Sequence, residues 1–156
     1  MTDFRLIFEV QNKMMPILKI LIVEIEPGIR NGISRILSNF SVKYPFMDEA
    51  VEFEIMEASG GEEAIGILES DRPDILFLSN NLPEIEGFEV QDYIEKKLKS
   101  IIVVMIVAYS MSGSAMNTNN NNAYDFILKP FTPRELTLTV ENITKRCFSN
   151  RTQLAS

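Results

Sequence analysis

The sequence predicts an α/β fold in which a parallel β-sheet is covered by helices on both faces. Short, nearly uninterrupted apolar runs, typical of strands buried on both sides, alternate about five times with segments whose apolar residues recur every three or four positions. The chain has 156 residues, 46% of them hydrophobic, which is enough for one domain with a single core. In such sheets function lies beyond the carboxyl ends of the strands. We therefore expect functional side chains in residues 24–28, 79–87, 109–115 and 129–132.

The first strand and helix are predicted by residues 17–40. Residues 17–23 are a β-branched and leucine-rich run interrupted only by Lys19, which indicates a buried strand. Pro27 is suited to the first turn of a helix, and the apolar residues after it share one helical face. These residues are Ile29, Ile33, Ile36, Leu37 and Phe40.

A loop, a lateral strand and a second helix follow. Residues 41–50 are polar and aromatic without a clear period, which predicts a long loop. Residues 51–56 alternate apolar and polar side chains, which is typical of a half-exposed strand at the side of a sheet. A glycine pair at residues 60–61 then opens a helix whose apolar residues are Ala64, Ile65 and Leu68.

The second half of the chain repeats the alternation. Residues 75–78 and 101–108 are predicted buried strands, with a helix over residues 88–98 between them. Residues 126–128 form a short strand, and the capping box at residues 132–135 opens the final helix. Its apolar face carries Leu136, Val140, Ile143 and Cys147.

Composition excludes several classes of function. The chain has no histidine and one cysteine, Cys147, which removes histidine-dependent nucleophilic catalysis, His-ligated zinc and internal disulfides. The single cysteine favours a reducing, cytoplasmic compartment. A net charge of −7 argues against binding nucleic acid or an anionic membrane. Residues 101–108, the longest apolar run, are too few to span a bilayer.

The predicted domain covers residues 17–148, between an N-terminal extension at residues 1–16 and a tail at residues 149–156. The extension has apolar residues that fit both a strand period and a helix period, and it lacks the layout of a signal peptide. We expect it to cover the domain or to mediate dimerisation.

Four stretches carry a more specific pattern. They are KILIVEIEPG at residues 19–28, EEA at residues 62–64, PDILFLSNNLP at residues 73–83 with GFEV at residues 87–90, and YDFILKPF at residues 124–131. Their order, their spacing and the Lys-Pro dipeptide resemble the response-regulator receiver domain, the phosphoacceptor module of two-component signalling. The resemblance covers about residues 17–146. It implies a flavodoxin-like fold with five parallel strands in the order 2-1-3-4-5.

The resemblance also implies a chemistry. In the family, an Asp carboxylate attacks the phosphoryl group of a partner's phosphohistidine while Mg²⁺ neutralises the developing charge. A Lys and a Thr or Ser bind the phosphoryl oxygens. This reaction needs a carboxylate nucleophile, hard oxygen ligands and positive charge beside the transferred group.

Several residues depart from that pattern. The acceptor position, four residues before Pro83, is Ser79, and a serine hydroxyl without a base is a poor nucleophile. The acidic pair after the first strand is Glu24-Ile25, and Ile25 has no side-chain oxygen for a metal. The hydroxyl position after the fourth strand is Val107, which cannot donate a hydrogen bond. These are losses at functional positions in an otherwise retained scaffold.

A metal site is expected to be weak or absent, and no cofactor is expected. Glu24 and Glu26 could share a face by the strand period and, with the Asn81 carbonyl, offer the remaining oxygens. Lys129 is the one principal phosphoryl-site residue retained, and we expect its ammonium to pair with Glu24 or Glu26. At the aromatic switch position stands Phe126, which can pack inward without a hydroxyl to satisfy.

The leading hypothesis is a receiver-like signalling module that no longer accepts phosphate, has no catalytic residue and acts through protein contacts. In the family the fourth helix, fifth strand and fifth helix form the output and dimerisation face, so a protein partner or a homodimer is expected there. Residues 110–122 are rich in Asn and Ser, so the fourth helix should be short, frayed or missing.

Two alternatives remain open. One is a small-ligand binder on a flavodoxin-like scaffold, although Pro27 lacks the amide hydrogen that a phosphate-cradling loop uses. The other is a hydrolase that uses Ser79 as the nucleophile and Lys129 as the base. A colourless protein would argue against flavin, and an esterase assay with Ser79→Ala would test the hydrolase.

Overall fold

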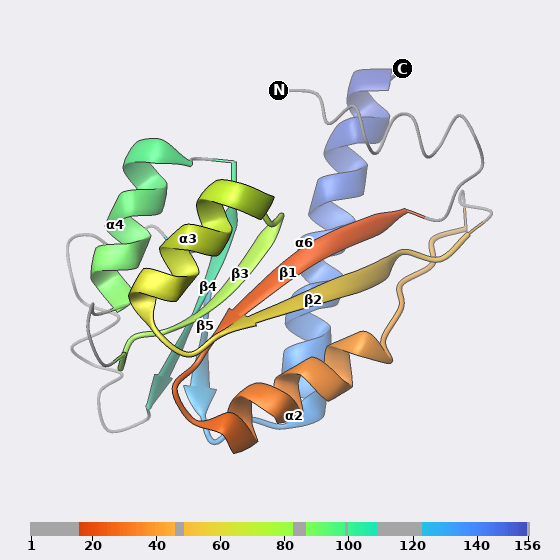
Figure 1. Ribbon diagram of the computed structural model, residues 1–156. Coiled ribbons are helices and arrows are strands. Elements are labelled where there is room, and N and C mark those ends of the chain that lie inside the picture. The colour runs from red at the N-terminus through yellow and green to blue at the C-terminus, as the bar shows by residue number, and fades with distance from the viewer. Residues whose placement is uncertain (1–15, 46–48, 83–86, 99, 109–122, 156) are drawn as a thin grey trace.

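A single parallel sheet of five strands organises the molecule. The computed structural model describes residues 16–45, 49–82, 87–98, 100–108 and 123–155. The strand order is β2-β1-β3-β4-β5, with every neighbouring pair parallel, which confirms the predicted topology (Figure 1). The strands are β1 (Ile17–Val23), β2 (Glu52–Ala58), β3 (Ile75–Ser79), β4 (Ile102–Ala108) and β5 (Asp125–Lys129).

Helices cover both faces of this sheet, as the sequence predicts. They are α2 (Pro27–Ser38), α3 (Gly61–Asp71), α4 (Gly87–Lys97) and α6 (Pro133–Ala155). In Figure 1, α3 and α4 lie on one face while α6 crosses behind the strands with α2 beside it. The predicted helix starts agree with these to within one or two residues. The end of the last helix differs, because α6 continues to Ala155 through residues predicted to be a tail.

Two hydrophobic clusters hold the three layers together. One joins the sheet to α2 and α6 and includes Ile33, Leu37, Val140 and Ile143. The other joins the opposite face to α3 and α4 and includes Leu68. The strands alternate their side chains between the two clusters, so the central strands β1, β3 and β4 are buried on both faces. Burial on both sides explains their nearly continuous apolar sequence.

Local signals set the ends of several elements. Pro27 begins α2, and the Thr132 hydroxyl accepts the amide hydrogen of Glu135 at 3.1 Å, which caps α6 as the sequence predicts. Inside the predicted loop at residues 41–50, Val42 forms an antiparallel bridge with Val51 just before β2. That bridge ties the loop to the side of the sheet.

Two predicted segments lie outside the described residues. They are the segment predicted to hold a weak fourth helix, at residues 110–122, and most of the N-terminal extension. In the part of the chain that is described, no helix is both long and apolar enough to cross a membrane.

The strand register brings the carboxyl-terminal ends of four strands together at one end of the sheet, which we call the carboxyl edge. Val23 of β1 lies opposite Leu78 of β3, and Ala108 of β4 lies opposite Lys129 of β5. The residues that follow these strands therefore meet at the same edge, where the sequence places the candidate site.

Candidate functional site

A buried carboxylate stands at the centre of this edge. Glu24 follows β1 directly, and its side chain is 0% exposed. Its Oε2 accepts the amide hydrogen of Glu26 at 3.0 Å, and its Oε1 lies 2.6 Å from the Lys129 ammonium. The second contact is an ion pair in distance but lacks the angles of a hydrogen bond. Lys129 was expected to pair with Glu24 or Glu26, and the structure confirms the pair with Glu24. The ammonium compensates a carboxylate charge that burial alone would disfavour.

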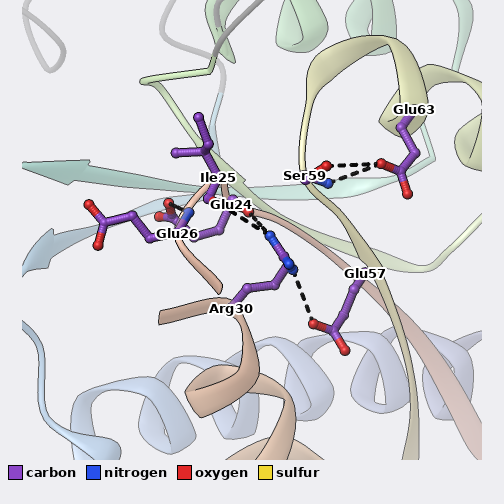
Figure 2. Close-up of polar contacts among 7 residues, drawn as sticks. All are labelled: Glu24, Ile25, Glu26, Arg30, Glu57, Ser59 and Glu63. Atoms are coloured by element: carbon purple, nitrogen blue, oxygen red, sulfur yellow. Dashed lines mark hydrogen bonds and ion pairs between the residues drawn. The ribbon is translucent and has the colours of Figure 1, made fainter. Parts of the chain in front are cut away.

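An arginine fixes the turn that carries this carboxylate. The Nη1 of Arg30, on the first turns of α2, donates to the carbonyl oxygen of Glu24 at 2.7 Å and to that of Ile25 at 3.4 Å. Its Nε lies 3.3 Å from Oε1 of Glu57 on β2 (Figure 2). One guanidinium thus joins the end of β1, the start of α2 and the neighbouring strand.

The two residues after Glu24 face outward. Ile25 is 42% exposed and Glu26 is exposed, and Figure 2 shows both side chains pointing away from Arg30. The expectation that Glu24 and Glu26 share a face is wrong. The strand ends at Val23 and the chain turns into α2, so the period of two no longer applies.

The end of β3 is neutral and closely packed. Ser79 is 1% exposed, and its hydroxyl accepts the amide hydrogen of Asn81 at 3.3 Å. Gly87, which opens α4, donates its amide hydrogen to the Asn80 carbonyl at 3.3 Å. A Cβ on Gly87 would lie 2.4 Å from the Ser79 carbonyl oxygen, so only glycine fits this approach. The helix start is pressed against the strand end.

The ends of β4 and β5 complete the edge with apolar side chains. Val107 is fully buried among the residues beneath α3 and α4. Phe126, at the predicted switch position, is half-buried and packs against the same cluster, as expected for a ring without a hydroxyl. Among the predicted site residues of β4 and β5, Val107 and Phe126 are apolar and Lys129 is charged.

Comparison with known families decides what this arrangement belongs to. A family model described as "Response regulator receiver domain" matches residues 20–141. The chain belongs to the response regulator receiver domain family. The fold and the order of motifs thus agree with the resemblance seen in the sequence.

Relatives of this receiver domain include longer transcriptional regulators. The transcriptional regulatory protein SrrA of Staphylococcus aureus is 30% identical over 128 residues, which are 82% of this chain and 48% of SrrA. The alkaline phosphatase synthesis transcriptional regulatory protein PhoP of Bacillus subtilis is 30% identical over 94 residues, which are 60% of this chain and 39% of PhoP. The chain spans about half the length, or less, of the curated relatives it matches.

Solved receiver domains share its architecture. The receiver domain of the response regulator AraT from Geobacillus stearothermophilus has a TM-score of 0.69 and 25% identity, over 86% of this chain and 98% of that one. The receiver domain of NtrX from Brucella abortus has a TM-score of 0.66 and 28% identity, over 79% and 95%.

The donor atoms of this receiver domain do not fit the Mg²⁺ that the family's reaction uses. The Glu24 carboxylate is already engaged by the Lys129 ammonium and a backbone amide, and Ile25 offers no side-chain oxygen. Ser79 offers a hydroxyl where a hard divalent cation favours a carboxylate. Among the described residues, no group of three acidic or cysteine side chains converges on a point that could hold a metal.

A pocket opens beside Lys129 on the α2 side. Its volume is about 450 Å³, and its lining is mostly apolar. Residues of α2 and of the turn after β5 line it: Gly28, Ile29, Gly32, Ile33, Ile36, Lys129, Pro130, Phe131 and Pro133. The pocket has no built phosphate cradle, because its one charged lining residue is paired with Glu24.

The structure also reveals two residues that the sequence analysis did not single out. Arg30 has its partners on another strand and in backbone carbonyls, and no local pattern signals such contacts. Gly87 stands in a quoted motif, yet its tight approach to Ser79 depends on how α4 meets β3. Glu24, Ser79, Val107 and Lys129 all come to the predicted edge, where the first three are buried, while Ile25, Glu26 and Asn81 are exposed residues.

Proposed function

We propose that this receiver domain transmits a signal through protein contacts without accepting a phosphoryl group. The ion pair between Glu24 and Lys129 carries the proposal. Lys129 stands where the family binds phosphoryl oxygens, and here a buried carboxylate 2.6 Å away already neutralises its charge. An incoming phosphoryl group would have to displace that carboxylate and leave it buried without a counterion.

The nucleophile position supports the same conclusion. Ser79 is nearly inaccessible, its hydroxyl accepts the Asn81 amide hydrogen, and no carboxylate of the described residues is hydrogen-bonded to it. Val107 offers no hydroxyl to a phosphoryl oxygen. These features also weigh against a Ser79 and Lys129 hydrolase, because a general base must reach the nucleophile's proton and Lys129 is paired elsewhere. We therefore assign no enzymatic role and no cofactor.

The partner is proposed to be a protein that binds the face to which β5 and α6 contribute, the family's output face. Two of the exposed large hydrophobic residues lie there, Leu138 on α6 and Tyr124 before β5, and Leu138 is 47% exposed. Arg146 places its guanidinium 5.2 Å from the centre of the Tyr124 ring, which orders that side chain at the surface. A second copy of the chain is one candidate partner. The cytoplasm is the proposed compartment, as inferred from the lone cysteine.

The phosphoryl half of the proposal is tested with Mg²⁺ and beryllofluoride. Backbone amide NMR signals of Ser79, Val107 and Lys129 are expected to show no saturable, Mg²⁺-dependent shift. A receiver domain that has an acceptor aspartate serves as the positive control in the same titration. Saturable shifts at these three amides would contradict the proposal.

The contact half is tested with surface variants. The immobilised domain is used to retain the protein that co-purifies with it. Leu138→Asp should reduce this retention at least tenfold. Ile17 is an exposed apolar residue at the start of β1, and Ile17→Asp should leave retention unchanged. If the partner is a second copy, sedimentation should show the Leu138→Asp protein as a monomer. Equal loss in both variants would argue against this face.

A further inference from the structure

Within the described residues, β2 is the last strand on one side of the sheet and its outer edge carries no further strand. In the described structure β2 pairs along its length with β1 alone. The Glu52 amide donates to the Pro16 carbonyl at 3.0 Å, and the Ala58 carbonyl accepts the Glu24 amide hydrogen at 3.1 Å. In a parallel ladder both backbone groups of a residue point to the same side. The backbone groups of the even-numbered residues of β2 therefore bond to β1. Those of the odd-numbered residues point away from β1.

Three residues of β2 have backbone groups that point away from β1 and are not hydrogen-bonded within the described structure. Within the described residues, the backbone groups of Phe53, Ile55 and Glu57 have no hydrogen-bond partner. The position before them differs, because Val51 and Val42 exchange two hydrogen bonds, at 2.7 and 3.0 Å. Among the described residues, the pairing on this side of β2 therefore stops after Val51. A row of unpaired backbone groups is a template for a further strand.

The charge around this edge is strongly negative. β2 and α3, the helix that follows β2 and contacts it, hold seven acidic residues and no basic one over residues 52–71. On β2 itself Glu52, Glu54 and Glu57 are all exposed. Glu57 meets Arg30, whereas Glu52 and Glu54 form no ion pair with any described residue. The edge therefore attracts cationic groups and repels anionic ones.

We propose that an extended segment of a partner protein, with lysine or arginine at alternate positions, adds to the free edge of β2 as a sixth strand. Backbone hydrogen bonds to Phe53, Ile55 and Glu57 would hold it, and its cations would meet Glu52 and Glu54. A second copy paired edge to edge would instead place these carboxylates near their own counterparts, and opposed like charges are destabilising. The proposal does not depend on phosphate chemistry, because it uses backbone groups and carboxylates of β2 and none of Ser79, Val107 and Lys129.

The test uses an acetylated, amidated eight-residue peptide of alternating lysine and valine as the probe. At saturating peptide, amide hydrogen exchange at Phe53, Ile55 and Glu57 should slow at least tenfold. Exchange at Glu52 and Glu54 should stay as it is, because these amides already bond to β1. The matched peptide with glutamate in place of lysine should protect none of them.

A second experiment reverses the charge of the β2 carboxylates and measures the affinity for the lysine peptide. The variant Glu52→Lys/Glu54→Lys should bind the lysine peptide at least tenfold more weakly, while Glu95→Lys, on α4 away from the edge, should bind as the wild type does. Equal protection by both peptides, or protection confined to other strands and helices, would overturn the proposal. Protection of the same amides that rises with protein concentration, without peptide, would assign the edge to a second copy and also overturn it.

Discussion

The carboxyl edge of the sheet has two halves that differ in how polar groups are buried. At the ends of β1 and β5, Glu24, Lys129 and Arg30 are charged and bonded to one another or to backbone carbonyls. At the ends of β3 and β4, Ser79 and Val107 are neutral and packed against helix and strand. In the first half each charge has a partner within the fold, whereas Ser79 and Val107 in the second half carry no charge.

Removing the lysine is the strongest way to break this comparison. Lys129→Met leaves the Glu24 carboxylate buried without its counterion, so the free energy of unfolding should fall by about 3–5 kcal/mol in urea denaturation. The double variant Glu24→Gln/Lys129→Met removes both charges and should recover most of that loss. A single variant as stable as the wild type would show that the carboxylate is not buried against the ammonium in solution.

Adding a methyl group beside the end of β3, in the neutral half, should cause the next largest loss of stability. Gly87→Ala places a Cβ 2.4 Å from the Ser79 carbonyl oxygen, and neither backbone segment gives way easily. We expect a loss of roughly 2–3 kcal/mol in the same assay. Gly66→Ala in α3 is the matched control, since a Cβ there meets nothing within 4 Å and should stabilise the helix by about 0.5–1 kcal/mol.

A hydroxyl in the neutral half sharpens the comparison further. Val107→Thr keeps the shape of the side chain but buries a polar group among apolar ones, which should cost roughly 2 kcal/mol of unfolding free energy. Thermal or urea denaturation measures it. Unchanged stability would indicate a hydrogen-bond partner for the new hydroxyl and would contradict the description of this half as neutral and apolar.

The smallest expected effect concerns the charged half. Arg30→Met gives up the hydrogen bonds to the Glu24 and Ile25 carbonyls and the contact with Glu57, for about 1 kcal/mol. Arg35→Met, exposed in the last turn of the same helix, should change stability by less than about 0.5 kcal/mol. Equal values for the two variants would mean that Arg30 does not fix the turn.

Features set by local periodicity could be predicted from the sequence. The buried strands and the apolar faces of α2 and α6 follow from patterns within a few residues, and the Thr132 cap from a four-residue motif. The ion pair between Glu24 and Lys129 was also predictable, because the topology brings the ends of β1 and β5 to one edge where opposite charges meet.

Features set by the path of the chain were not predictable. The orientation of Glu26 was predicted wrongly because the alternation of a strand stops where β1 turns into α2. The roles of Arg30 and Gly87 depend on how α2 meets β2 and how α4 meets β3, and no pattern near either residue encodes those meetings. The roles proposed for Ser79 and Val107 stay predictions until the phosphoryl analogue is tried.

The ion pair at Lys129 has a consequence for timing. A metal ion and a phosphoryl group arrive and leave, so a site that uses them reports events in the cell. The ammonium of Lys129 is covalently part of the chain and is present from the moment the domain folds. The charge balance at this edge should therefore be the same with chelator or with millimolar Mg²⁺. Under the proposed function, the signal then lies in which partners are present rather than in a chemical change at this edge.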